Sequence, residues 1–224
     1  MKFRTTSGTK QRVFLRGMTL IELLVVMAIM LTLLALVGYS FQSFGRTTEI
    51  TNGIQDVANV LNVARQIAVS RNEYAQVRIY GAPATDFRAG QFTALAVFRA
   101  DAPYYTNDYT ALLSAGRMRQ EGQIARLPQS CIITSNAPYS PLIQTLISDS
   151  MRQILLADGT KGVAFYFKPD GSLDIPATNG TGPTVNALSI CAMQAFAAAG
   201  KTLPPNYGII NMDRINGRFQ VVRP

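Results

Sequence analysis

Gly17-Met18-Thr19-Leu20-Ile21-Glu22 lies where a basic N-terminal segment gives way to an apolar run, and this junction decides the fold of the N-terminal part. The segment before it carries five basic side chains and no acidic one, namely Lys2, Arg4, Lys10, Arg12 and Arg16. From Leu23 to Gly45 the chain has no charged residue. A helix rises about 1.5 Å per residue and crosses a bilayer in roughly 20 apolar residues. Residues 23–45 are therefore predicted to form a membrane-spanning helix.

The charge of the flank predicts the orientation of this helix. Basic residues beside a membrane span stay in the cytoplasm. We therefore expect a single span in a bacterial inner membrane, with a cytoplasmic N-terminus and everything after Gly45 on the periplasmic side. A conventional cleaved signal peptide and an uncleaved anchor are the alternatives.

The next segment is predicted to continue the helix with one apolar face. Between 46 and 72, apolar residues recur at spacings of three and four: Ile54, Val57, Ala58, Leu61, Ala64, Ile67 and Ala68. This periodicity is typical of an amphipathic helix packed on a partner surface. Gly38, Gly45 and Gly53 each weaken a helix, so we expect any bend of the helix near them.

After Arg71 the pattern changes to short strands and turns, which predicts a β-rich head over 73–224. The expected elements are strands over Gln76–Tyr80 and Phe92–Arg99, a hairpin pairing Gln153–Ala157 with Val163–Phe167, a tight turn at Pro169–Gly171, and a hairpin pairing Ile209–Met212 with Arg218–Val222. Segment 141–156 reads as a helix or as a helix followed by a strand, and segments 101–126 and 187–205 receive no assignment. The fold class is α+β, with a long N-terminal helix packed on a mostly antiparallel sheet.

Glu22 needs compensation, because a carboxylate inside an apolar span costs free energy. If the chain is cut after Gly17, the new amine of Met18 supplies a positive charge at the same depth. Pairing between Glu22 and the Met18 amine of an adjacent copy would lower the cost of burial and fix the register between subunits. The alternative is that Glu22 lies in the headgroup region.

The junction resembles the N-terminal signal of type IV pilins and type II secretion pseudopilins. That pattern has a glycine before the cut, a hydrophobic first mature residue, and a glutamate fifth; Gly17, Met18 and Glu22 match, although Met18 stands where phenylalanine is most frequent. The resemblance implies cleavage between Gly17 and Met18 by a prepilin peptidase, with removal of the leader 1–17. It also implies N-methylation of Met18 and assembly with other pilin subunits through the helix half 18–45.

Motifs in the head resemble the GspH/FimT type of pseudopilin. They are Ala64-Arg65-Gln66-Ile67-Ala68 before the first strand, Leu127-Pro128, the turn Phe167–Ser172, and the closing Gly217-Arg218 hairpin. Segments 91–99 and 127–128 and the terminal Arg223-Pro224 also resemble the prepilin-type Verru_Chthon cassette proteins. The resemblance implies a structural minor pilin or pseudopilin of a type II secretion or type IV pilus-like filament. The alternatives are a DNA-binding minor pilin and a monomeric, membrane-anchored surface protein.

Charge and residue inventory bear on the remaining classes of function. The net charge of +8 includes the five leader residues, so the rest of the chain is only mildly basic. Some FimT-like pilins bind DNA through a basic C-terminal region, which would involve Arg218 and Arg223, although solvated surface arginines are the simpler interpretation. Cys131 and Cys191, the two cysteines, would form a disulfide or stay as two buried thiols. The chain has no histidine, so we expect no enzymatic activity, no metal and no cofactor.

Overall fold

A computed structural model describes residues 18–100, 118–156, 159–175 and 186–223, with the side chains of 36–46 and 100 outside the description. The predicted leader 1–17 also lies outside the described residues. The elements in chain order are α1 (Leu20–Arg71), β1 (Ala75–Gly81), β2 (Phe92–Ala100), β3 (Met118–Arg126), β4 (Cys131–Ile133), α3 (Pro141–Ser148), the 3-10 turn η1 (Ser150–Arg152), β5 (Gln153–Leu155), β6 (Lys161–Phe167), β7 (Leu173–Asp174), β8 (Asn186–Ala192), α4 (Met193–Ala198), β9 (Tyr207–Met212) and β10 (Phe219–Val222). Two compact units result, with their boundary between Ser43 and Phe44.

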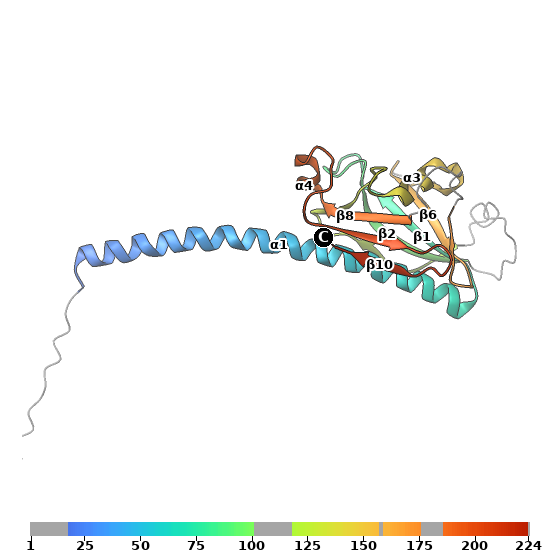
Figure 1. Ribbon diagram of the computed structural model, residues 1–224, viewed down its shortest axis with the longest axis horizontal. Coiled ribbons are helices and arrows are strands. Elements are labelled where there is room, and N and C mark those ends of the chain that lie inside the picture. Colours follow the sequence, from blue (N-terminus) through green and yellow to red (C-terminus); the bar gives the residue numbers. More distant parts are fainter. Residues whose placement is uncertain (1–17, 101–117, 157–158, 176–185, 224) are drawn as a thin grey trace, which may run out of the picture. The chain divides into compact units, whose positions relative to one another are not determined.

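The second unit is built on one ten-stranded sheet. Its order is β10-β9-β8-β4-β2-β1-β6-β5, with β3 paired to β2 and β7 paired to β6. Every pairing among the described strands is antiparallel. From residue 47 on, α1 lies along one side of these strands, and α3 and α4 lie on the other (Figure 1). The expected α+β class, a long helix packed on an antiparallel sheet, is confirmed.

The second half of α1 carries the apolar stripe that the sequence predicts. Its buried members are Ile50, Ile54, Val57, Leu61, Ala64 and Ala68, while Ala58 and Ile67 are partly buried. The buried members and Ile67 join the inward-facing residues of the strands in a single core. Because residues three and four apart lie on one helix face, the spacing alone is enough to direct this stripe at the sheet.

A smaller apolar cluster covers part of the outer face of the sheet. Ile132 of β4, Cys191 of β8 and Phe196 of α4 form its buried centre. Segment 187–205, which contains Cys191 and Phe196, received no assignment from the sequence; the structure shows strand β8 followed by the short helix α4 there. Every residue of β8 from 187 to 192 is buried, so side chains on both faces of this strand are covered.

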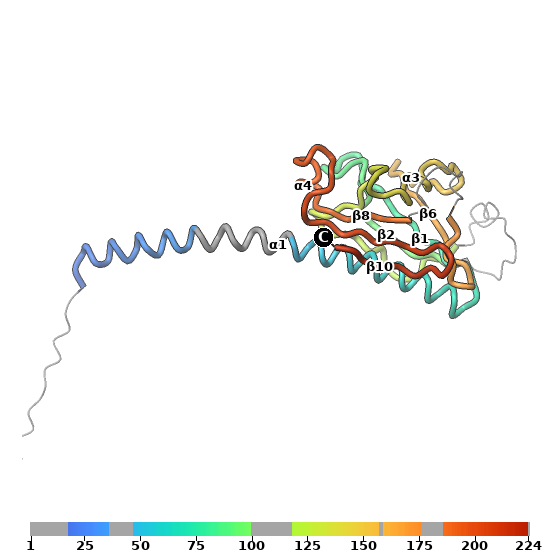
Figure 2. The backbone as a smooth tube through the Cα atoms, in the orientation of Figure 1, coloured from blue at the N-terminus to red at the C-terminus, as the bar shows by residue number. Residues whose placement is uncertain are grey.

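The C-terminal strands lie beside the second half of α1 (Figure 2). Arg65 donates from Nε to the carbonyl oxygen of Asn216 over 3.2 Å, which ties the helix to the β9–β10 turn. The turn at 169–171 closes against the same place, because a Cβ on Gly217 would overlap the carbonyl oxygen of Gly171. Three of the motifs that suggested a GspH/FimT-like head thus meet at one junction.

Most predicted turns and hairpins are confirmed. Gly171 and Gly217 have φ of 81° and 61°, values that glycine adopts without strain. β5 pairs with β6 and β9 pairs with β10, as expected. Segment 141–156 is a helix, a 3-10 turn and then a strand. α1 continues through all three of its glycines.

Candidate functional site: the N-terminal motif

The described chain begins at Met18, so Gly17 and the bond before Met18 lie outside the described residues. Met18 itself is exposed. The helix starts two residues later at Leu20, which leaves the backbone around Met18 outside regular structure. Whether this bond is cut therefore stays a prediction.

Thr19 and Glu22 form a reciprocal cap at the start of α1. The Thr19 hydroxyl accepts from the Glu22 N–H over 3.3 Å, and the Glu22 carboxylate accepts from the Thr19 N–H over 2.9 Å. The Thr19 hydroxyl also donates to the carboxylate, at 2.9 Å. This is the capping box, in which a threonine before the helix and a glutamate three residues later satisfy each other's backbone donors. This local role of Glu22 was not predicted, although the Thr-x-x-Glu spacing indicates it.

Over residues 20–35, the part of the first half of α1 whose side chains the structure describes, the apolar side chains are exposed. They include Leu20, Ile21, Leu23, Leu24, Val25, Val26, Met27, Ile29, Met30, Leu31, Leu33 and Leu34. An exposed apolar surface of this extent is typical of a site for lipid or protein contact. Within the described residues, no helix is both long enough and apolar enough to span a membrane.

Three polar contacts hold α1 where it enters the head. Thr47 accepts from the Asn206 side chain at 3.3 Å, and Thr51 accepts from Arg223 Nη2 at 2.9 Å. The carboxylate of Glu49 accepts from the Ser130 hydroxyl. Thr47, Glu49 and Thr51 lie within one five-residue stretch of the helix. The head therefore contacts this stretch through polar side chains as well as through the core.

The two cysteines are free and buried. Cys131 faces the main core, where its Sγ would lie 3.5 Å from a Cβ placed on Gly53. Cys191 belongs to the outer cluster, and its register partner across the β4–β8 pair is Ile132 rather than Cys131. Successive residues of a strand point to opposite faces. The structure therefore shows two separate thiols, and a disulfide would require a shift of strand register. Burial raises the pKa of Cys191 to about 12.

Arg218 and Arg223 are exposed but do not form a cluster. Arg218 precedes β10 and Arg223 follows it, and five residues of extended chain span about 16 Å. Arg223 is also engaged with Thr51. The structure brings neither arginine to a shared groove.

Polar groups in the head that could suggest a site serve the fold. Gln76 donates from Nε2 to the hydroxyl of Tyr166 at 2.6 Å, and burial raises the pKa of Tyr166 to about 12. Arg152 pairs with Asp174 at 2.6 Å. Asp170 accepts from the Ser172 N–H, as expected of a turn, and hydrogen bonds from Ser172 lower its pKa. Among the described residues, no group of three or more His, Cys, Asp or Glu side chains could hold a metal ion.

Comparison with known proteins bears on the N-terminal motif. The family model described as the prokaryotic N-terminal methylation motif matches residues 16–38. No curated protein and no solved structure matches the chain. The chain thus carries a prepilin-type methylation motif, which is typical of inner-membrane prepilins. Proteins of this pilin-like class are in general structural subunits rather than enzymes.

Proposed function

We propose that this protein is a minor pilin or pseudopilin, a structural subunit of a type II secretion or type IV pilus-like filament. A prepilin peptidase cuts between Gly17 and Met18, Met18 is N-methylated, and the first half of α1 assembles beside the helices of other subunits. The observation that carries this proposal is the methylation motif at 16–38, which begins just before an exposed apolar helix.

The exposed half of α1 supports assembly through this helix. Its side chains have no partner surface among the described residues of the first unit, whereas the second half of the same helix is packed on a sheet. Burying apolar surface contributes about 25 cal/mol per Å². Lipid before assembly, and neighbouring helices after it, would both supply that burial. The basic leader keeps the N-terminus cytoplasmic and the head periplasmic.

Glu22 gives the assembly its register in this proposal. In the single chain its carboxylate is capped by Thr19. A carboxylate has about four acceptor positions, so it can accept from a further donor while keeping the cap. The amine of Met18 on a neighbouring subunit is that donor once the leader has been removed.

The head motifs support a GspH/FimT-like subunit. Arg65 lies in the Ala-Arg-x-x-Ala segment and contacts the β9–β10 turn, which in turn lies against the turn at 169–171. These motifs are far apart in the sequence but contact one another in the structure, which explains why they would occur together.

Glu22→Gln is the sharpest test of the charge pairing. Glutamine can also complete a capping box, so the helix start is kept while the negative charge is lost. We expect cleavage to continue and the amount of protein in isolated filaments to fall about tenfold, the equivalent of roughly 1.4 kcal/mol. Quantitative immunoblotting of the filament fraction measures this.

Thr19→Ala is the matched control, because it removes the hydroxyl of the cap and keeps the charge. Incorporation close to wild type is expected for that variant. If Glu22→Gln enters filaments as well as wild type, the charge pairing is wrong. If neither variant nor the wild type is found in filaments, the proposed function itself is wrong.

A further inference from the structure

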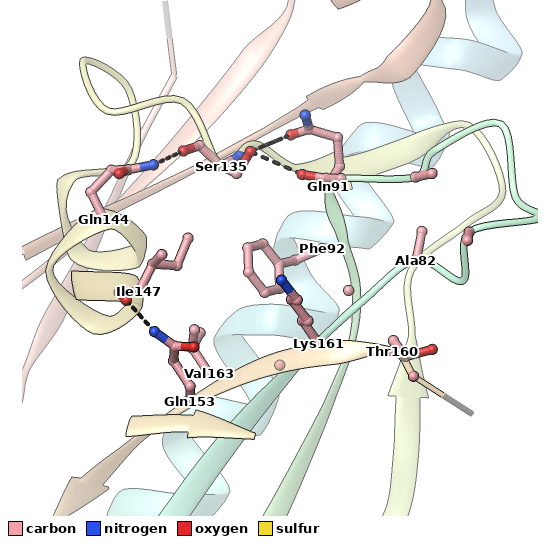
Figure 3. A pocket seen from close by; sticks show the side chains of 16 residues that line it. Ala82, Gln91, Phe92, Ser135, Gln144, Ile147, Gln153, Thr160, Lys161 and Val163 are labelled. Atoms are coloured by element: carbon pink, nitrogen blue, oxygen red, sulfur yellow. Dashed lines mark hydrogen bonds between the residues drawn. The ribbon is translucent and has the colours of Figure 1, made fainter. Parts of the chain in front are cut away.

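A cavity of about 560 Å³ opens on the head between the β1–β2 connection, α3 and the β5–β6 hairpin (Figure 3). Phe92, Ile147 and Val163 supply its larger apolar side chains, each from a different element. Volumes of this size are typical of small-molecule sites, which are mostly apolar with a few polar groups.

Two glycines in the wall of the cavity have no room for a side chain. A Cβ on Gly81 would lie 2.7 Å from the carbonyl oxygen of Lys161, and a Cβ on Gly162 would lie 2.9 Å from that of Ile79. Side chains at these positions would have to displace the neighbouring backbone. β1 and β6 therefore present backbone rather than side chains to this part of the cavity.

Three glutamine amides line the cavity in defined orientations. Gln91 accepts from the Ser135 N–H at 2.9 Å through its carbonyl oxygen, so its NH2 group is left to donate. Gln144 and Gln153 do the reverse. Their NH2 groups donate to the backbone carbonyls of Ser135 and Ile147, which leaves two side-chain carbonyls as acceptors. Figure 3 shows these bonds.

Lys161 is the one charged residue among the described residues that line the cavity, and its side chain extends toward Phe92 (Figure 3). Among the described residues, no acidic residue lines the cavity and Lys161 has no ion-pair partner; Asp158, next to the lining residue Gly159, lies outside the described residues. The nearest acid along the β1–β2 connection, Asp86, is paired with Arg88 at 2.8 Å. Within the described lining, Lys161 is therefore the group that an anionic part of a ligand would contact.

We propose that this cavity binds a small carboxylate with an apolar body. The carboxylate accepts from Lys161, and the apolar body lies against Phe92, Ile147 and Val163. This binding is independent of filament assembly, because all lining residues belong to the second unit.

Fluorine NMR on the full-length protein in zwitterionic lipid nanodiscs tests this proposal. The probes are para-fluorophenylacetate and its neutral analogue para-fluorophenylacetamide, each compared with empty nanodiscs. We expect protein-dependent line broadening with tighter binding of the carboxylate. Lys161→Gln should weaken carboxylate binding about two- to fivefold, the range for an exposed ion pair, and leave the amide unchanged.

Two further variants separate the site from general effects. Lys168→Gln removes a lysine that does not line the cavity, so both probes should bind as they do to wild type. Ala89→Trp places a large side chain at an exposed lining position, so both probes should lose binding while the protein stays folded. Absence of binding to wild type, equal affinity for the two probes, or equal losses with Lys161→Gln and Lys168→Gln would overturn the proposal.

Discussion

The two halves of α1 have similar apolar residues but opposite surroundings. In the first half, Leu20, Leu24 and Leu31 are 82%, 61% and 67% exposed. In the second half, Val57, Leu61 and Ala64 are completely buried against the sheet. Polar residues alternate with apolar ones only in the second half, because only there does the same chain provide both a core and a solvent side. Under the proposed function, the partner of the first half is lipid or the helix of a neighbouring subunit.

Matched leucine truncations in the two halves have the largest expected difference. Leu61→Ala leaves a cavity in the core and should lower the free energy of unfolding of the head by about 2–5 kcal/mol. Leu31→Ala should change it by less than about 0.5 kcal/mol, because the side chain is exposed. Urea unfolding of the full-length protein in nanodiscs, followed by tyrosine near-ultraviolet circular dichroism, measures both. Equal losses for the two variants would break the comparison.

Gly217→Ala tests the junction that holds the end of α1. The residue has φ of 61°, and a Cβ there would overlap the carbonyl oxygen of Gly171. We expect a loss of about 2–3 kcal/mol in the same unfolding assay. Gly90→Ala is the control, since Gly90 has φ of 82° but nothing within 4 Å of an added Cβ. A smaller loss in that control isolates the packing contribution from the backbone contribution.

Gly53→Ala should stabilise the head. An added Cβ would make ordinary contacts with Cys131 and Pro128, at 3.5 Å and 3.6 Å, and alanine favours the helix by about 0.5–1 kcal/mol. Gly208→Ala, on the strand facing the same turn of α1, should instead destabilise, because its Cβ would collide with Ile54. A destabilising Gly53→Ala would mean that the helix lies closer to the sheet than the structure shows.

The smallest expected effect is a pH dependence of the free energy of unfolding that comes from Asp86 in the β1–β2 connection. Hydrogen bonds from the side chain and then the backbone of Arg88 lower the pKa of Asp86. A lowered folded-state pKa stabilises above the unfolded value of about 3.9, and the stabilisation is lost as pH falls through the folded pKa. Asp86→Asn should therefore lower stability at pH 7 by less than about 1 kcal/mol and flatten the loss below pH 4. An unchanged acid limb in urea titrations would contradict this.

Periodicity was sufficient to predict the second half of α1 and several strands. Spacings of three and four placed Leu61 and Ala64 on the buried face, and turn residues such as Gly171 and Gly217 placed the hairpins. The N-terminal motif was also readable, because its meaning lies in local residue order.

Elements whose stability depends on distant partners could not be predicted. β3 is mostly polar and exposed, and it is held by backbone pairing with β2 rather than by an apolar face. β8 is buried on both sides and so lacks the alternation that marks a half-buried strand. The cavity near Lys161 draws its lining from segments up to about 80 residues apart, so no local pattern indicates it.

Mass spectrometry of the mature N-terminus tests the account most directly. The protein should be isolated from its native membrane and its N-terminal peptide sequenced. We predict that it begins at Met18 with one added methyl group on the amine. A working protein that retains residues 1–17, or one cut beyond Ala35, would contradict the proposal that the first half of α1 is a processed assembly helix.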